Sequence, residues 1–278
     1  GGEATSNVAN TSLLDIAGAT FLQSGGIGGD NDAGPSGDGF GGIAQVLIND
    51  QSQFDVLSLQ LDASARGGVS NSTLGGGNAT GGNGLVFLAA DGVLNVANGV
   101  NILSNAVGGD NTNGDAGDGL GGVAQVRLQA AGGLVDILGD VFLDASGTGG
   151  SASGTTEGAG GLGDAGVAVV DLPNGGEFNA NSLLAIAEGT GGSSTSLGGN
   201  FPAGRGGDAL GGIASLFVDA GGSATLTQSF EARASAFAGF GDGGGNAEGG
   251  SAVLRVIVGS IGVGTNADVG ASAFGGAS

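Results

Sequence analysis

Residues 41–48 read GGIAQVLI, and close copies follow at residues 81–88 (GGNGLVFL) and 121–128 (GGVAQVRL). Weaker copies complete a series that starts near positions 1, 41, 81, 121, 165, 211 and 249. The 278 residues thus hold seven repeats of about forty residues, a period typical of solenoids and propellers. We therefore expect residues 1–278 to form a single repeat domain with a split repeat at its two ends.

Each repeat contains short stretches in which residues alternate with period two, the pattern of β-strands. The predicted inward residues of the first strand include Ala44, Val46 and Ile48; Ala124, Val126 and Leu128; and Ala168, Val170 and Leu172. The predicted inward residues of the third strand are Leu59, Leu61 and Ala63; Val100, Ile102 and Ser104; Val141, Leu143 and Ala145; Leu184, Ile186 and Glu188; and Phe230, Ala232 and Ala234. We expect the strand that holds Leu184 and Ile186 to end at Glu188, so that this carboxylate faces water.

Two or three inward residues per strand cannot offset the entropy of ordering one repeat, so the repeats must stack on one another. Three short strands with tight glycine turns indicate one coil of a parallel β-helix, the all-β fold that we favour. A seven-bladed β-propeller is the alternative. Arg127 and Asp171 distinguish the two folds, because these equivalent outward positions are stacked neighbours only in a solenoid.

A glycine-rich segment of roughly 10 to 20 residues follows each third strand, as in residues 147–163 and 189–211. These segments account for most of the variation in repeat length. One hypothesis is that they are plain loops. The other is that extended, polyglycine-like chains stack across repeats and form a second layer beside the coil.

The composition excludes several classes of function. Glycine supplies 68 residues, while Cys, Met, His and Trp are absent, and 26 carboxylates face only five arginines, for a net charge of −21. These counts argue against disulfides, thiolate metal sites, histidine chemistry and nucleic-acid binding. The absence of Met indicates a processed product or a segment of a longer chain, and no apolar run reaches the roughly 20 residues of a membrane span.

The phrases GDGFGGIA (residues 37–44), GDGLGGVA (residues 117–124) and VFLDASG (residues 141–147) resemble glycine-rich repeats of bacterial filamentous-haemagglutinin-like and autotransporter adhesins. This resemblance covers essentially the whole chain. It implies secretion, a right-handed parallel β-helix and a role in surface attachment or matrix. No catalytic residue is carried over with it.

Acidic loops are the best candidates for a ligand site. Two aligned loops, two repeats apart, supply a possible calcium site with these predicted ligands: Asp30, Asp32, Asp38, Asp110, Asp115 and Asp118. Asp and Asn oxygens on a glycine-rich backbone suit Ca²⁺. The same residues also form turns, and diffuse screening of the net charge by divalent ions competes with specific binding. We expect no other cofactor.

These observations together predict an extracellular structural or adhesive protein at the bacterial cell surface, without enzymatic activity. The predicted partners are a second copy, bound head-to-tail through the split terminal repeats, and host or matrix glycans. Exposed Leu47, Phe87 and Phe217 in an outward column indicate a covered face, through lateral packing or the glycine segments. A propeller lectin, a glycan- or ice-binding face, and a β-helix polysaccharide hydrolase or lyase are the alternative functions.

Overall fold

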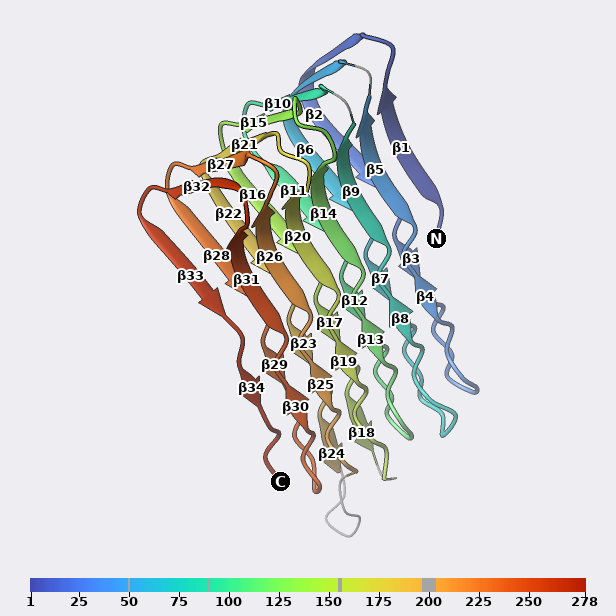
Figure 1. The fold of residues 1–278 in the computed structure, drawn as a ribbon. Helices are drawn as coiled ribbons and strands as arrows, with labels where there is room; N and C mark the ends of the chain where they lie inside the picture. The colour runs from blue at the N-terminus through green and yellow to red at the C-terminus, as the bar shows by residue number, and fades with distance from the viewer. Residues whose placement is uncertain (50, 90, 155–156, 197–203) are drawn as a thin grey trace.

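The structure is a computed structural model that describes residues 1–278 except for residues 50, 90, 155–156 and 197–203. The chain winds through seven coils that stack along one axis as a parallel β-solenoid (Figure 1). Equivalent strands of successive coils pair in parallel and in register, as Ala44 does with Gly84. The copies forty residues apart therefore lie directly over one another, as predicted, and the propeller alternative is wrong.

The first strand of each coil belongs to a seven-stranded sheet, which we call the first face. Its strands in spatial order are β1 (Glu3–Val8), β5 (Ile43–Ile48), β9 (Asn83–Leu88), β14 (Val123–Leu128), β20 (Val167–Leu172), β26 (Ile213–Val218) and β31 (Ser251–Val256). Arg127 pairs with Asp171 in this sheet, and their Nε and Oδ2 atoms lie 3.6 Å apart. The contact that we used to distinguish a solenoid from a propeller is thus present.

The second and third strands form the other two faces of the coil, which share one sheet. In the first two coils they are continuous, as β2 (Leu13–Gln23) and β6 (Gln53–Asp62). In later coils the second-face strands are β10 (Val93–Val96), β15 (Leu134–Ile137), β21 (Glu177–Ala180), β27 (Gly222–Leu226) and β32 (Gly259–Val263). The third-face strands are β11 (Val100–Leu103), β16 (Asp140–Asp144), β22 (Ser182–Ile186), β28 (Ser229–Arg233) and β33 (Asn266–Gly270).

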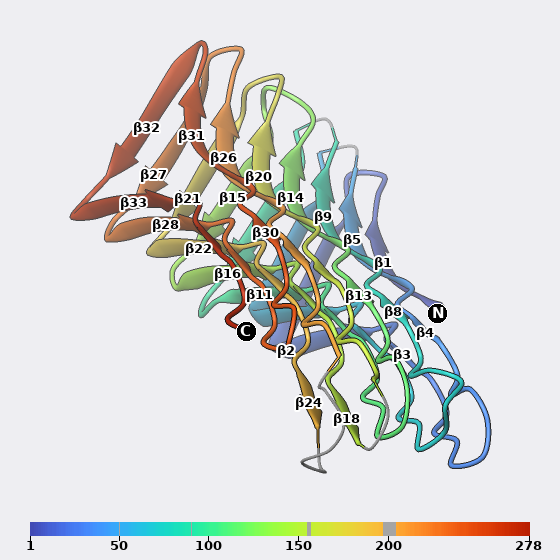
Figure 2. The same cartoon turned by 90° about the horizontal axis from the view of Figure 1, so that it is seen from below.

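Each glycine-rich segment runs outward from the coil and then returns to the next one. The outgoing legs form β3 (Gly26–Ile27), β7 (Ala65–Arg66), β12 (Ala106–Val107), β17 (Gly147–Thr148), β23 (Gly189–Thr190), β29 (Ala236–Phe237) and β34 (Ala273–Phe274). The returning legs form β4 (Gly39–Phe40), β8 (Ala79–Thr80), β13 (Gly119–Leu120), β19 (Gly163–Asp164), β25 (Ala209–Leu210) and β30 (Ala247–Glu248). A third pair of strands, β18 (Ala152–Gly154) and β24 (Ser194–Ser196), lies toward the outer end of this layer (Figure 2).

These two rows of legs make up the glycine layer, and a single ladder of backbone hydrogen bonds crosses it. Gly37 N donates to Gly29 O at 2.8 Å, and Gly68 N donates to Gly37 O at 2.9 Å. Each further link joins a leg to its neighbour in the same way, through Gly77, Gly109, Gly117, Gly150, Gly161, Gly192, Gly207, Gly239, Gly245 and Gly276. The described residues therefore form the packed layer of our second hypothesis, whereas residues 197–203 of that prediction lie outside the described part.

The core inside the coils is a set of side-chain ladders. Most of the predicted inward residues of the first and third strands are fully buried, and Phe54, Phe178 and Phe230 are the largest of the buried side chains. Phe54 and Phe178 belong to one column of the second face, which continues through the in-register pairs Leu94–Val135 and Ala224–Ile261. Residue size thus varies along the axis within one column, and Phe178 lies between the smaller Val135 and Ala224.

One predicted strand register is wrong. The inward residues of β22 are Leu183 and Ala185, with Ala187 following, rather than Leu184, Ile186 and Glu188. Leu183 pairs with Val141, although β21 keeps the register of β15. The turn between β21 and β22 holds one residue, Asn181, whereas the coil before it has two at this corner. Because this one residue is missing, each residue of β22 faces the side opposite to the one we predicted.

Candidate functional site: the acidic corner groove and the carboxylate loops

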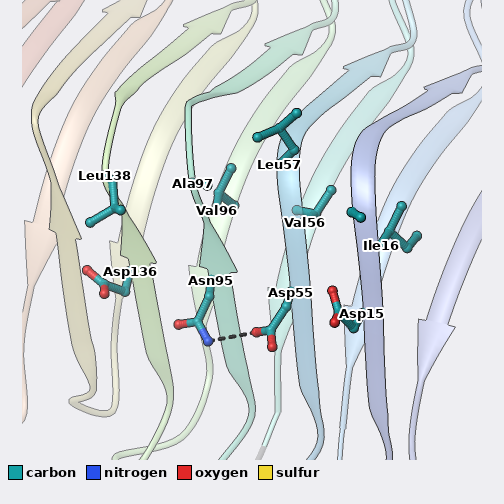
Figure 3. Close-up of a pocket in the computed structure, with 11 residues that line it drawn as sticks. Asp15, Ile16, Asp55, Val56, Leu57, Asn95, Val96, Ala97, Asp136 and Leu138 are labelled. Carbon is teal, nitrogen blue, oxygen red and sulfur yellow. Dashed lines mark hydrogen bonds between the residues drawn. The ribbon is translucent and has the colours of Figure 1, made fainter.

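A groove of about 340 Å³ crosses four coils where the second face turns toward the third (Figure 3). One polar side chain from each coil lines it, and these are Asp15, Asp55, Asn95 and Asp136. The in-register pairing of β2, β6, β10 and β15 places them in a single column. Exposed Leu57 and Leu138 form an apolar border beyond that column.

Hydrogen bonds hold the central carboxylate of this column. Asn95 Nδ2 donates to Asp55 Oδ1 at 2.7 Å (Figure 3), and Gln53 Nε2 donates to both Asp55 oxygens at 2.8 Å. These bonds fix the orientation of the Asp55 carboxylate. The groove therefore offers acidic groups beside an apolar border, an arrangement suited to a cation or to hydroxyl and amide donors. The sequence signal for it was the alignment of Asp15, Asp55 and Asp136 at repeat spacing.

The two predicted calcium loops lie in the same row of the solenoid but not in contact. Asp30, Asp32 and Asp38 belong to the first coil and the other three carboxylates to the third, with the second coil between them. The bridges Asn31–Ser70 and Ser70–Asn111 show this intervening coil directly. The structure therefore does not bring the two loops together into one site.

Most of these carboxylates instead connect one coil to the next. Each of five carboxylates accepts a backbone N–H of the following coil at 2.8 Å: Asp30 from Val69, Asp38 from Asn78, Asp110 from Ser151, Asp115 from Ala159, and Asp118 from Leu162. Asp32 Oδ1 accepts the Asn71 side chain at 2.6 Å. Among the residues that the structure describes, no group of three or more acidic side chains is arranged to hold a metal ion. A calcium site in these loops stays a prediction.

An asparagine closes each of the two loops, and our sequence reasoning missed it. Asn111 is fully buried; its Oδ1 accepts Asn113 N at 3.0 Å and its Nδ2 donates to Asp115 O at 3.0 Å. Asn31 makes the equivalent bonds with Ala33 and Pro35. Such Asx turns mimic backbone turns. The repeated Gly-Asp-Asn phrase was the available signal, but it points equally well to metal ligation.

Because backbone N–H groups already occupy these carboxylates, we expect divalent ions to act by screening. Ca²⁺ and Mg²⁺ at equal ionic strength should raise the midpoint of thermal unfolding equally, since screening depends on charge and concentration. Calorimetric unfolding scans with each ion measure this. Specific stabilisation by Ca²⁺ that Asp110→Asn and Asp118→Asn both abolish would contradict the expectation and establish the loop site.

Three carboxylates have pKa values above their ordinary range because they are partly buried. Burial raises the pKa of Asp164. Burial also raises the pKa of Asp171, against the opposing effect of Arg127. For Glu188, burial raises the pKa most, Arg233 lowers it, and Asp144 and Glu231 raise it. Glu188 lies beyond the end of β22 and is half-buried, so the predicted strand end is confirmed and the predicted water exposure is partial.

We expect Asp164→Asn combined with Glu188→Gln to stabilise the protein at pH 7. A carboxyl whose folded pKa lies above its unfolded value disfavours folding when ionised, and this cost disappears as the pH falls through the raised folded pKa toward the ordinary values of 3.8 and 4.5. The advantage of the double variant should therefore shrink between pH 7 and pH 4. Urea unfolding of both proteins across this range measures it, and an advantage that grows on acidification would contradict it.

Comparisons of the chain with protein-family models, with curated proteins and with solved structures find no match. The fold and the candidate sites are therefore known from the residues and their geometry alone. No helix capable of spanning a bilayer occurs in the part of the chain that the structure describes.

Proposed function

We propose that the chain is an extracellular structural or adhesive protein: a stiff β-solenoid module of a secreted adhesin or filament at the bacterial cell surface. The observation that carries this proposal is the glycine ladder from Gly29 to Gly276, which couples every coil to its neighbours beside the ladders of the three faces. Bending the stack in any direction would stretch the hydrogen-bonded rows on its convex side. Stiffness of this kind suits a load-bearing or spacing role.

The proposal includes two kinds of partner. Every internal junction shows how one coil docks on the next, through in-register pairing of β14 with β20 and of their counterparts in the other sheets. A second copy that docks head-to-tail would repeat this junction. Host or matrix glycans are the other proposed partner, and the acidic corner groove supplies acceptors for their hydroxyl groups.

Stiffness can be measured with two spin labels, because the chain has no native cysteine. Leu13 and Ser260 belong to one outward column of the second face, in the first and seventh coils. With Leu13→Cys and Ser260→Cys, we expect a narrow electron–electron distance distribution centred near six rungs, about 29 Å before the label arms are added. A broad distribution would contradict a rigid module.

The adhesive and enzymatic readings can be separated with polysaccharides. We expect the protein to bind glycans on an array without releasing reducing ends from them, and Asp55→Asn to weaken binding if the groove is the contact. Val93→Asn, on an outward position of the same face, serves as the control. Release of reducing ends that Asp55→Asn abolishes would replace the proposed role with that of a hydrolase or lyase.

A further inference from the structure

The first face differs from the other two faces in charge. Its four charged residues balance, because Glu3 and Asp171 are negative and Arg127 and Arg255 are positive. The strands of the second face carry four carboxylates and no cation: Asp15, Asp55, Asp136 and Glu177. The strands of the third face carry five carboxylates and one cation: Asp62, Asp140, Asp144, Glu231, Asp268 and Arg233. The first face therefore has no net charge, although the whole chain has a net charge of −21.

The neutral first face also carries many apolar side chains. Ten of its outward side chains are aliphatic or aromatic, all of them partly exposed: Ile43, Leu47, Leu85, Phe87, Val123, Val167, Val169, Ile213, Phe217 and Val253. Both cations also make contacts within the face. Arg127 pairs with Asp171, and the Arg255 guanidinium lies 5.5 Å from the centroid of the Phe217 ring. Apolar side chains gathered on one exposed face mark an interaction surface.

We propose that the first face is a lateral interface on which a second copy of this chain docks with its own first face. The proposal rests on the structural role proposed above and deepens it by naming how two modules associate side by side. Seven rungs by six residues per strand give a flat area of about 700 Å². A stable interface buries about 800 Å² of each partner, so the area of the first face is close to the required size.

Charge favours a second copy as the occupant and sets its orientation. Two acidic molecules repel each other through any face that carries net negative charge, and the first face is the side of the coil where this local repulsion is absent. Glu3 lies in the first coil and Arg255 in the last. When the two stacks run in opposite directions, the Arg255 end of each copy lies over the Glu3 end of the other. We therefore infer an antiparallel pair of solenoids with their first faces packed about 10 Å apart.

The oligomeric state of the full chain tests this proposal by sedimentation at increasing protein concentration. We expect a monomer–dimer equilibrium that tightens from 50 mM to 500 mM NaCl, because salt screens the repulsion between the two acidic bodies and leaves apolar burial intact. Leu85→Glu combined with Val169→Glu should raise the dissociation constant at least 100-fold. Leu13→Glu combined with Leu134→Glu adds the same charge to outward apolar positions of the second face and should change the dissociation constant less than threefold.

Thermal unfolding of both double variants establishes that they fold. A wild-type chain that stays monomeric to 100 µM in 500 mM NaCl overturns the proposal, as does a dimer that is insensitive to Leu85→Glu with Val169→Glu. A monomer that floats with neutral phosphatidylcholine vesicles overturns it too, because the face would then bind lipid. None of these outcomes affects the distance between Leu13→Cys and Ser260→Cys within one chain, so the proposed stiffness is judged separately.

Single spin labels on the first face identify the contact and its direction. Gln125 projects from the middle coil, so a label at Gln125→Cys should lie within about 25 Å of its partner across the interface. Head-to-tail contact would instead separate the labels by seven rungs, about 34 Å. Gln45→Cys, two coils away, should give a longer distance than Gln125→Cys in an antiparallel pair. Equal distances at the two positions overturn the antiparallel arrangement.

Discussion

Gly117→Ala should destabilise the protein by more than about 3 kcal/mol, although it adds one methyl group. A Cβ at Gly117 would lie 1.9 Å from Gly77 O and 3.1 Å from Gly109 N. Both are backbone atoms of adjacent legs, so no side chain can move aside to relieve the overlap. Gly117 N also donates to Gly109 O, and Gly117 O accepts Gly150 N, so a displaced leg loses two links of the ladder.

Urea unfolding measures the loss, and hydrogen exchange of the Gly109 and Gly150 segments shows where it occurs. Gly29→Ala is the matched control, because Gly29 accepts the first bond of the same ladder but a Cβ there meets nothing within 4 Å. We expect this control to change the free energy of unfolding by less than about 0.5 kcal/mol. Equal effects of the two substitutions would show that the close packing of the legs does not stabilise the protein.

Phe178→Ala should cost about 3–5 kcal/mol, the range for truncating a buried aromatic side chain. Phe178 is fully buried in β21, and its in-register neighbours are Val135 and Ala224. The small side chain of Ala224 cannot expand into the space that Phe178 leaves. A cavity at the fifth coil would therefore remain open within an otherwise continuous column.

Phe240→Ala is the control, because Phe240 is 61% exposed in the glycine layer. We expect it to change the free energy of unfolding by less than about 0.5 kcal/mol. In a solenoid each coil is stabilised mainly by its neighbours. Phe178→Ala weakens the fifth coil, so we also expect the coils on its two sides to unfold in two separate transitions. A single transition with an unchanged midpoint would show that Phe178 does not stabilise its column.

The stacked fold was predictable because its signal repeats. A two-residue alternation such as Ala44, Val46 and Ile48 is weak alone, but seven aligned copies indicate both the strand and its partner. The pairing of Arg127 with Asp171 followed from repeat alignment without knowledge of distances. The register error at Leu184 arose where the repeat is irregular, since the loss of one corner residue leaves every hydrophobic residue in place and reverses the face it occupies.

The glycine layer and the candidate sites were less predictable for physical reasons. Glycine has no side chain to alternate, so neither the short strands nor the link from Gly37 to Gly68 leaves a pattern in the sequence. Asp38 and Asp118 show the opposite difficulty. Their residue type fits a metal ligand, a turn and an acceptor for the next coil equally well, and only the geometry shows that they accept backbone N–H groups.

The unequal coil lengths have an evolutionary consequence. First strands begin 40 residues apart in the early coils, but 44 residues separate β14 from β20 and 46 separate β20 from β26. The additional strands β18 and β24 lie in these two adjacent coils and pair with each other. Extra backbone at the tip of one coil thus finds hydrogen-bond partners in a neighbour that is extended as well. We therefore expect insertions at the tips of neighbouring coils to be gained and lost together.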